Sequence, residues 1–573
     1  MQYCGGNKKS ESKHPRYVVD HTDSVEVAGH RLCQFIDPHN VIDSNEGPRR
    51  PLVIISVDES CIFTDNPRDT VWILFSLLRR AFREIVDYPI FSLFLSTAGR
   101  LDLSPPEQRS RSSPSSRIVN LELHFLPPIC EISFDDVAFP ASENTVSLRQ
   151  VVGMDWICHL GRPLYVCFGF FFFASSLLFA FTRFGTRYDA LAEKGREEHI
   201  MDFAQQKLLC GESILRGDNV PGILACLAVR FALEFNTDGA SRAIACQQVK
   251  CHMRLCLAAN HGLKKLVTTS PSEPLLAEAA RDLFQHTGMD PIDHLAHHLN
   301  LNCIDLGRRG ELVAAFVLMQ ARDKAAKEKR WMSVSEFMKA LFPSAYYKAL
   351  QSSTPTLWLK GERKTFSEAF NDYGMWFNHV IRVDSFEMLS ADNLWKYITR
   401  GAMVVCKESQ FGVDIVLPVC LVDQELSRDT VTAIYFQVRN NKKYERGVDQ
   451  GLLNVMDPFL LGLFSEGQRP RPIIRVVFAL TSQENGVLFP NQRTLRLHHP
   501  DKFTAFDIWC GGLSSNTFNN IGEDPGPYRV LLERSLRPSD TFDLNETNYP
   551  KMDPVTRDKR RLRRRKMTAL VRI

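Results

Sequence analysis

The chain has 573 residues, and its 44% hydrophobic and 24% charged residues are typical of a soluble globular protein with room for roughly three to four domains. The formal net charge is +4, but residues 559–566 (KRRLRRRK) carry seven positive charges, so the rest of the chain has a net charge of −3. This excludes a uniformly basic body, and any affinity for nucleic acid would have to come from local patches.

The N-terminal residues 1–49 form a poorly defined region. The opening MQYCGGNKKSESK is polar, which is unlike a secretory leader, and the fifteen cysteines have no paired short spacings. We therefore expect reduced thiols and a nuclear or cytoplasmic location. Cys246, Cys251 and Cys256 are spaced by five residues, so a helix would not keep them on one face as a metal site requires.

Residues 52–60 (LVIISVDES) are β-forming residues that end in Asp58 and Glu59. A buried apolar strand ending in two carboxylates is the Walker B pattern of NTPases, where the aspartate holds the Mg²⁺ shell and the glutamate polarises the attacking water. After a predicted helix, residues 90–97 (IFSLFLST) form a second strand that ends in Thr97, where such enzymes carry a polar γ-phosphate sensor. This order predicts a parallel α/β sheet with these side chains at its carboxyl edge.

The phosphate loop that such a site needs is missing, because no G-x-x-x-x-G-K-[ST] occurs in the chain. Residues 5–10 (GGNKKS) have suitable residue types, but Lys9 lacks the preceding glycine that lets backbone amides wrap a phosphate. We therefore expect no NTP hydrolysis, and ATP binding is an open question. Arg162, in HLGRPL, is interpreted either as a phosphate-sensing arginine or as a structural residue at the start of a helical region.

Residues 166–181 (VCFGFFFFASSLLFAF) are membrane-like and just short of the roughly 17–25 apolar residues that span a bilayer. A single-pass membrane protein is the literal interpretation. The alternative is a translated intron over residues 165–183. The codons of residues 164–166 can contain the intron donor GTATGT, and the codon of Arg183 can supply an acceptor AG. In-frame excision then leaves GRPL followed directly by FGTRYDA.

We expect the dominant transcript to lack the codons of residues 165–183, because the sequences on both sides have the character of a soluble protein. Sequencing cDNA across this point is the measurement. A dominant mRNA that retains these codons would contradict the intron hypothesis and leave the membrane anchor as the interpretation.

From about residue 187 to residue 345, apolar residues recur at spacings of three and four, as in IMDFAQQKLL, VKCHMRLCLAA and PLLAEAARDLF. This spacing predicts helices. We interpret the region as a helical lid or a winged-helix-like connector, in which the sequence indicates no chemistry.

Residues 402–406 (AMVVC), 413–417 (VDIVL) and 431–438 (VTAIYFQV) predict three successive strands. Asp414 lies on the second, and Gln437 and Arg439 lie two residues apart at the end of the third. Residues two apart on a strand share a face, so these groups can converge. This is the layout of the PD-(D/E)xK nucleases, in which carboxylate and amide oxygens hold Mg²⁺ and a basic residue orients the attacking water.

Such folds often add a glutamate from a preceding helix, and Glu311 in RGELVAA is the candidate. The alternative is structural: Asp414 caps a hairpin, while Gln437 and Arg439 simply face solvent. Spacing alone does not separate these two interpretations.

A large family of uncharacterised fungal proteins resembles this chain over roughly residues 50–540. The matching blocks are GRPL…GTRYDA, SEPLLAEAA, RGELVAA, FSEAFNDYGMWFNHVI, GVDIVLPVCL, VTAIYFQVRNN, MDPF, PRPIIRVVFAL and FDIWCGGLS. The blocks at 366–381 and 412–441 are the most specific. That family is similar to Crinkler-type and retrotransposon-hot-spot proteins, so the resemblance implies a P-loop NTPase fused to a restriction-endonuclease-like domain that acts on nucleic acid.

The chain departs from this pattern where the family usually has Gln-Val-Lys, because here the triplet is Gln437-Val438-Arg439. A planar, permanently charged guanidinium is a poor substitute for an ammonium that orients water. Asp414 is then the one firm carboxylate ligand, so Mg²⁺ affinity should be weak. Together with the missing phosphate loop, this substitution indicates a degenerate site and a possible pseudoenzyme.

The sequence therefore predicts an α/β protein with a truncated P-loop-like parallel sheet, a helical middle and a restriction-endonuclease-like domain. Three functions stay open: a Mg²⁺-dependent nuclease, a catalytically dead nucleic-acid-binding or interaction protein, and a single-pass membrane protein. The expected divisions are residues 1–49, an NTPase-like remnant at 50–160, a helical connector at 161–300, a nuclease-like domain at 301–540 and a basic tail at 541–573.

Overall fold

The computed structural model describes part of the chain, and by its contacts the protein divides into two units, residues 1–101 (unit 1) and 102–573 (unit 2). The described residues are 24–38, 51–57, 78, 81–94, 134–135, 138–162, 189–212, 219–235, 239–259, 266–298, 309–326, 329–359, 363–383, 385–407, 410–440, 447–465, 470–490 and 502–536.

Unit 1 contains helix α1 (Val25–Ile36) and strands β1 (Val53–Val57) and β2 (Ile90–Phe94). The two strands pair in parallel, from Val53 opposite Ile90 to Val57 opposite Phe94, so the predicted parallel pair is confirmed. The predicted NTPase residues that follow these strands, Asp58, Glu59 and Thr97, lie outside the described residues.

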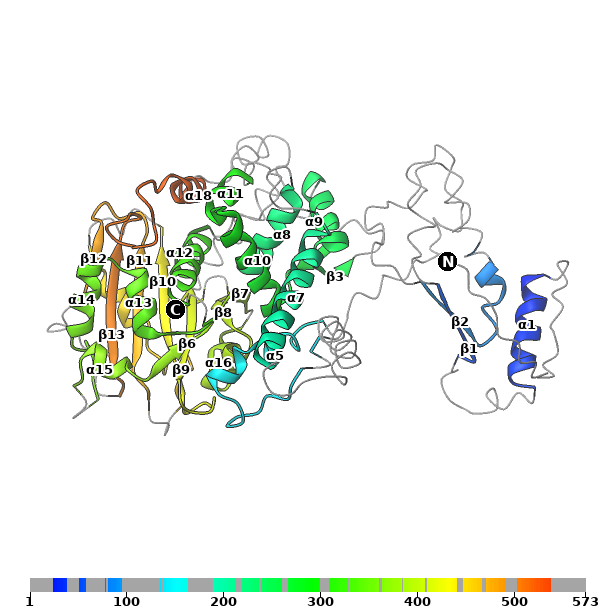
Figure 1. The fold of residues 1–573 in the computed structure, drawn as a ribbon, viewed down its shortest axis with the longest axis horizontal. Coiled ribbons are helices and arrows are strands. Elements are labelled where there is room, and N and C mark those ends of the chain that lie inside the picture. Colours follow the sequence, from blue (N-terminus) through cyan, green and yellow to red (C-terminus); the bar gives the residue numbers. More distant parts are fainter. Residues whose placement is uncertain are drawn as a thin grey trace, which may run out of the picture. The chain divides into compact units, whose positions relative to one another are not determined.

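Unit 2 is mixed α/β (Figure 1). Its helices are α4 (Leu148–Val151), α5 (Met154–Ile157), α7 (Asp189–Leu209), α8 (Val220–Phe231), α9 (Gly239–Cys251), α10 (Pro274–Thr287), α11 (Pro291–His298), α12 (Arg309–Ala326), α13 (Val334–Leu341), α14 (Ser344–Ser352), α15 (Phe366–Phe370), η5 (Phe386–Leu389), α16 (Ala391–Thr399), α17 (Gln450–Asn454) and α18 (Gly526–Leu536).

The described strands of unit 2 form one large mixed sheet and a separate hairpin. They are β3 (Leu255–Ala259), β4 (Leu266–Thr269), β5 (Met332–Ser333), β6 (Tyr373–Met375), β7 (His379–Arg382), β8 (Ala402–Val405), β9 (Ile415–Leu421), β10 (Val431–Arg439), β11 (Ile473–Ala479), β12 (Gly486–Leu488) and β13 (Ala505–Gly511). The large sheet has the order β12-β13-β11-β10-β9-β6-β5, with β8 beside β9 and β7 beside β8. Strands β10, β11 and β13 run parallel, and β9 runs antiparallel to β10.

The three strands predicted at 402–406, 413–417 and 431–438 are confirmed as β8, β9 and β10. All seven residues of β9 are buried, which agrees with its nearly continuous apolar sequence. The sheet forks at β9, because β8 pairs near residue 415 and β6 pairs near residue 421. Pro418 lies between these two pairings, where neither β6 nor β8 pairs with β9. Its missing N–H therefore costs no hydrogen bond to either strand.

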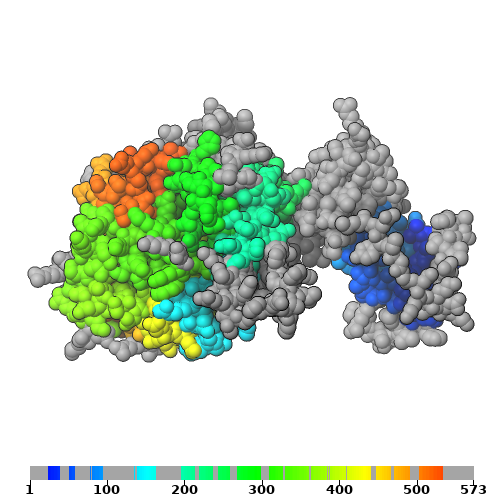
Figure 2. Space-filling model, viewed as in Figure 1, coloured from blue at the N-terminus to red at the C-terminus, as the bar shows by residue number. Residues whose placement is uncertain are grey.

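The hydrophobic core of unit 2 is a single cluster that extends from Val146 to Leu532. Helices α7, α8 and α10 pack on one another beside β7, and α16 packs on β8, β9 and β10 (Figure 1). The segment around α4 lies against the β9–β10 hairpin, where Asn144 donates its backbone N–H to the Leu426 carbonyl at 3.0 Å. Figure 2 shows these two segments side by side, in cyan and yellow.

The helix expected over VKCHMRLCLAA is wrong in its second half. Helix α9 ends at Cys251, and Leu255–Ala259 forms β3, which pairs with β4. Met253 has a φ of +61°, a left-handed conformation that stops the helix and redirects the chain. Apolar spacing does not reveal such a single-residue reversal.

No helix in the described part of the chain is long and apolar enough to cross a membrane. The apolar run at 166–181, the possible intron at 165–183 and the basic tail at 559–566 lie outside the described residues.

Gly401 ends helix α16 with a φ of +62°, and a Cβ at this position would overlap the ring of buried Trp376. We expect Gly401→Ala to lower the free energy of unfolding by about 2–4 kcal/mol, since left-handed strain and overpacking add. Gly462 has a similar φ of +76° with open space around it, so Gly462→Ala should show the strain alone, about 1–2 kcal/mol. Urea unfolding of both variants measures the difference, and equal losses would contradict the clash.

Candidate functional site

The predicted nuclease-like residues gather where β10 ends and β9 begins. Residue 415 pairs with residue 436, and the Asp414 N–H donates to the Phe436 carbonyl at 2.9 Å, so Asp414 lies beside the end of β10. Gln437 and Arg439 share one face of β10, because successive side chains alternate between faces. The carboxyl ends of the parallel strands β8, β10, β11 and β13 meet at this edge of the sheet, which we call the carboxyl edge.

Direct contacts join Asp414, Gln437 and Arg439. Asp414 Oδ2 accepts the Val438 N–H at 2.7 Å and Arg439 Nη1 at 3.2 Å. In the orientation that satisfies both ends of its amide, Gln437 accepts from Arg439 Nη2 through oxygen and donates to the Leu452 carbonyl at 3.2 Å through nitrogen. The Arg439 guanidinium therefore bridges the carboxylate and the amide.

Burial dominates the electrostatics of Asp414. Removing this carboxyl from water raises its pKa, and the Val438 N–H and the Arg439 guanidinium oppose the rise without cancelling it. The Asp414 side chain is 17% exposed and that of Arg439 is 27% exposed, so solvent screens the pair only partly. The guanidinium is thus the resident counter-ion of this carboxylate.

This donor set does not fit Mg²⁺. Mg²⁺ requires near-octahedral oxygen ligands, whereas the cluster offers one carboxylate and one amide oxygen, both already bonded to a permanent cation. Among the described residues, no group of three His, Cys, Asp or Glu side chains forms a candidate metal site. A dication placed here would also repel the guanidinium a few ångströms away.

The proposed helical glutamate lies on a different side of the sheet. Glu311 is half-buried in the first turn of α12. A Cβ on the preceding Gly310 would touch Val438 and Asn440, so α12 packs on the face of β10 opposite to Gln437 and Arg439. The structure thus brings together three of the four predicted nuclease-like residues. Glu311 lies on the opposite face of β10.

Arg162 has a structural environment. Its Nη1 forms a 2.8 Å ion pair with buried Glu273, its backbone N–H donates to the same carboxylate at 2.9 Å, and its Nη2 donates to the Met253 carbonyl at 2.7 Å. Burial raises the pKa of Glu273, and Arg162 counteracts this. With these partners, Arg162 ties the segment before residue 162 to the start of α10.

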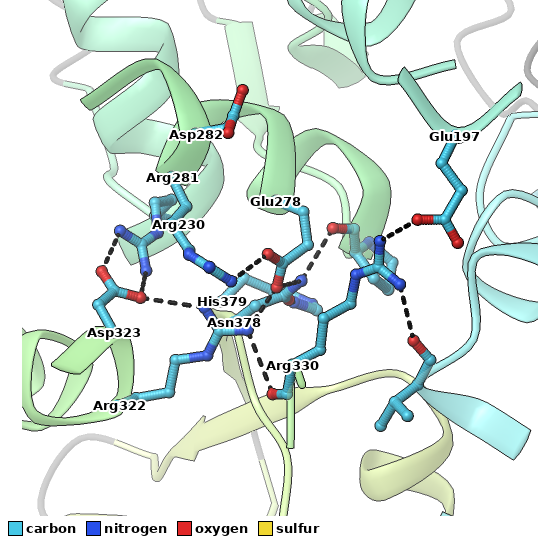
Figure 3. A network of polar contacts seen from close by, with 12 residues as sticks. Glu197, Arg230, Glu278, Arg281, Asp282, Arg322, Asp323, Arg330, Asn378 and His379 are labelled. Carbon is cyan, nitrogen blue, oxygen red and sulfur yellow. Dashed lines mark hydrogen bonds and ion pairs between the residues drawn. The ribbon is translucent and has the colours of Figure 1, made fainter. Parts of the chain in front are cut away.

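A buried charge network joins α8, α10 and α12 (Figure 3). It was not predicted from the sequence. Glu278 on α10 accepts from Arg322 on α12 and from Arg281 at 2.7 Å. Arg322 also pairs with Asp323 at 3.0 Å, and Arg230 on α8 holds Asp323 through two 2.8 Å bonds. We call these residues the α10 network. The signal that could have revealed it is the presence of charged residues inside otherwise apolar helices.

The α10 network overcomes the cost of burying its carboxylates. Burial alone would raise the pKa of Glu278, but Arg322, Arg281 and Arg330, with the amide of Asn378, lower it to about 2. Asn378 donates to Glu278 at 3.0 Å and to the Pro274 carbonyl at 2.9 Å, which connects α10 to the start of β7. Glu278 therefore stays charged at neutral pH.

A serine, a histidine and an asparagine form a relay at the border of this network. Ser272 Oγ lies 2.8 Å from His379 Nε2, and His379 Nδ1 lies 2.7 Å from Asn378 Oδ1. This order resembles a nucleophile, base and orienting group. However, burial and then the guanidinium of Arg400 lower the pKa of His379 to about 3, so the imidazole is too weak a base for general-base catalysis at neutral pH. We interpret the relay as structural.

A family model described as a domain of unknown function (DUF8736) matches residues 222–452. No curated protein and no solved structure matches the chain. The matched range extends from α8 into α17, so it includes the α10 network and the Asp414–Gln437–Arg439 cluster.

We expect His379 to make the free energy of unfolding decrease as the pH is lowered. Between its ordinary pKa of about 6.5 in the unfolded chain and about 3 in the folded protein, the unfolded state binds one more proton. The free energy of unfolding should therefore decrease by about 1.4 kcal/mol per pH unit as pH falls through this window. In His379→Gln this contribution is absent, and urea unfolding from pH 6 to pH 4.5 measures the difference in slope.

Ser272→Ala is the matched control, since it removes a neighbour of the imidazole but keeps the titrating group. Ser272→Ala should lower the free energy of unfolding without removing its dependence on pH. The same pH dependence in wild type and His379→Gln would show that His379 does not titrate in the way its burial requires.

Proposed function

We propose that unit 2 is a nuclease-like domain that binds nucleic acid without cleaving it. The observation that carries this proposal is the Arg439 guanidinium, which bonds both Asp414 and Gln437. In an active enzyme of the resembling family these two groups would be metal ligands. Here a side-chain cation that cannot dissociate occupies both oxygens and neutralises the Asp414 carboxylate.

The order of elements supports the comparison with restriction-endonuclease-like domains. Helix α16 is followed by the antiparallel strands β8, β9 and β10, then by α17 and by β11, which is parallel to β10. An aspartate directly before the second strand of this series and Gln-x-Arg at the end of the third are the arrangement that the sequence blocks led us to expect. The proposal concerns unit 2 alone.

Cations at the carboxyl edge support nucleic acid as the ligand. Lys407 follows β8 and is exposed, Arg439 ends β10, and Arg382 ends β7, whose parallel pairing with β8 places it at the same edge. Arg382 lies 3.5 Å from the half-exposed Glu234, so its charge is partly compensated. Lys442 and Lys443 follow Arg439 closely in the sequence. Basic side chains along one edge suit the phosphate backbone, which dominates such affinities.

The test uses the full chain with short single- and double-stranded DNA and RNA. We expect binding that weakens between about 50 and 200 mM salt and no cleavage with Mg²⁺ or Mn²⁺. Lys407→Ala should reduce the slope of log affinity against log salt by about 0.7–0.9, the effect of one lost phosphate contact. Lys396→Ala is the matched control, because Lys396 lies near Glu143, which binds Arg428 in the hairpin at the opposite edge.

The same assay tests the role of Arg439. Lysine cannot bridge two acceptors with a planar fork, so Arg439→Lys should free Gln437 and allow divalent-dependent cleavage. Asp414→Ala in that background should abolish the gain. Cleavage by the wild-type chain would contradict a silent site, and the absence of binding to any nucleic acid would contradict the proposed ligand.

A further inference from the structure

A separate pocket of about 260 Å³ lies at the other edge of the large sheet, near the amino end of β13. Its walls come from the end of α14 and the segment after it, from the start of β13 and from the residues after β12. The lining side chains used below are Ser352, Ser353, Thr354, Thr356, Phe489 and Phe506. Asp414 and Arg439 lie at the carboxyl edge, so this pocket is distinct from the cluster described above.

Three of the four hydroxyl groups of the pocket, those of Ser352, Ser353 and Thr356, are committed as donors. Ser353 Oγ donates to the Leu350 carbonyl at 2.7 Å, Thr356 Oγ1 donates to the Ala505 carbonyl at 3.0 Å, and Ser352 Oγ donates to a carbonyl of its own helix at 3.2 Å. A hydroxyl has one hydrogen and two lone pairs, so each of these groups has only acceptor capacity left for a ligand. The polar part of the lining therefore favours a ligand that brings N–H or O–H donors.

The acidic group in the lining does not turn the pocket into a cation site. Asp507 is fully buried, and both of its oxygens are held by Arg475, at 2.6 and 2.7 Å. Its charge is neutralised within the sheet. Among the apolar lining residues, the half-buried Phe489 offers a ring that suits a flat group, whereas Phe506 is 2% exposed and its ring packs against Phe366 and Phe370.

The chain around the pocket is basic. Trp358, 39% exposed, lies two residues beyond Thr356, and the Arg363 guanidinium lies 5.1 Å from its ring centre. Lys348 is exposed one turn before Ser352 on α14, and Lys502 is exposed three residues before β13. Three cations thus lie close in the sequence to lining residues, and such groups suit an anionic group of a ligand.

We propose that this pocket binds a nucleotide whose base carries an exocyclic amino group, such as adenine or cytosine. The base packs against Phe489, its amino group donates to the hydroxyl acceptors, and its phosphate faces Arg363. The volume is slightly below the range of about 300–1,000 Å³ that holds drug-sized ligands, which suits a base with its sugar rather than a larger cofactor. This inference does not depend on the proposed role of the carboxyl edge.

Calorimetric titration of the full chain with AMP and with IMP tests the amino group directly, because IMP replaces that group with an oxygen. We expect AMP to bind at least about tenfold more tightly. Adenosine and ribose 5-phosphate separate the base from the phosphate, and each should bind more weakly than AMP. Similar affinities for AMP and IMP, or for AMP and ribose 5-phosphate, would overturn the proposal.

Single-residue variants then test whether the ligand binds in this pocket. Ser352 is exposed and its hydroxyl donates within its own helix, so Ser352→Ala should fold normally and weaken AMP about fivefold while leaving IMP unchanged. Arg363→Ala should weaken AMP but not adenosine. Arg149→Ala is its matched control, because Arg149 also lies over a tryptophan, Trp331, but beside β5 at the far end of the strand order. Unchanged AMP affinity in both Ser352→Ala and Phe489→Ala would place the ligand elsewhere and overturn the assignment.

A 5′-phosphorylated oligonucleotide that begins with adenine distinguishes a free nucleotide from the end of a strand. Tighter binding of the oligonucleotide than of AMP, sensitive to Phe489→Ala, would identify the ligand as a strand end. Binding of the oligonucleotide that depends on Lys407 but not on Phe489 would report on the carboxyl edge instead, so the two proposals fail separately.

Discussion

The buried carboxylate of Glu278 is the interaction on which the arrangement of unit 2 depends. It lies on α10 and is held by Arg322 of α12 and by Asn378 at the start of β7, while Arg322 shares Asp323 with Arg230 of α8. Three helices and one strand therefore meet at a single charge cluster. Removing one member of such a cluster leaves a buried charge without a partner, which typically lowers the free energy of unfolding by about 3–5 kcal/mol. Apolar packing alone has no comparable preference for one relative position of these elements.

Several polar residues of the blocks quoted for the family resemblance are partners of one another in the structure. SEPLLAEAA contains Glu278 together with Ser272 and Glu273, the block at 366–381 contains Asn378 and His379, and GRPL contains Arg162, the partner of Glu273. These polar residues are therefore engaged within the protein. A block of polar residues in the sequence is thus weak evidence for catalysis until the contacts of those residues in the structure are known.

Much of the fold follows from the sequence, because buried strands and amphipathic helices leave local patterns. The strands β8, β9 and β10 were predictable from their apolar runs, whereas spacing alone left open whether Asp414 would approach Gln437. The α10 network was not predictable, because its partners are separated by 44 residues between Glu278 and Arg322 and by 100 between Glu278 and Asn378. The hairpin β3–β4 was missed for a local reason, the left-handed Met253.

Arg439 combines two roles, because its guanidinium bonds the acceptors around it and is also partly exposed. A guanidinium has five N–H donors, and within the described residues three of them are engaged, by Asp414, by the Val438 carbonyl and by Gln437. The side chain is 27% exposed, so a phosphate can reach the remaining donors without displacing the carboxylate. Displacement would be costly, because Asp414 is buried and its charge needs this partner. The cation that blocks a metal is therefore compatible with phosphate binding, and this is the physical reason to expect a binding site where a cleavage site would otherwise be.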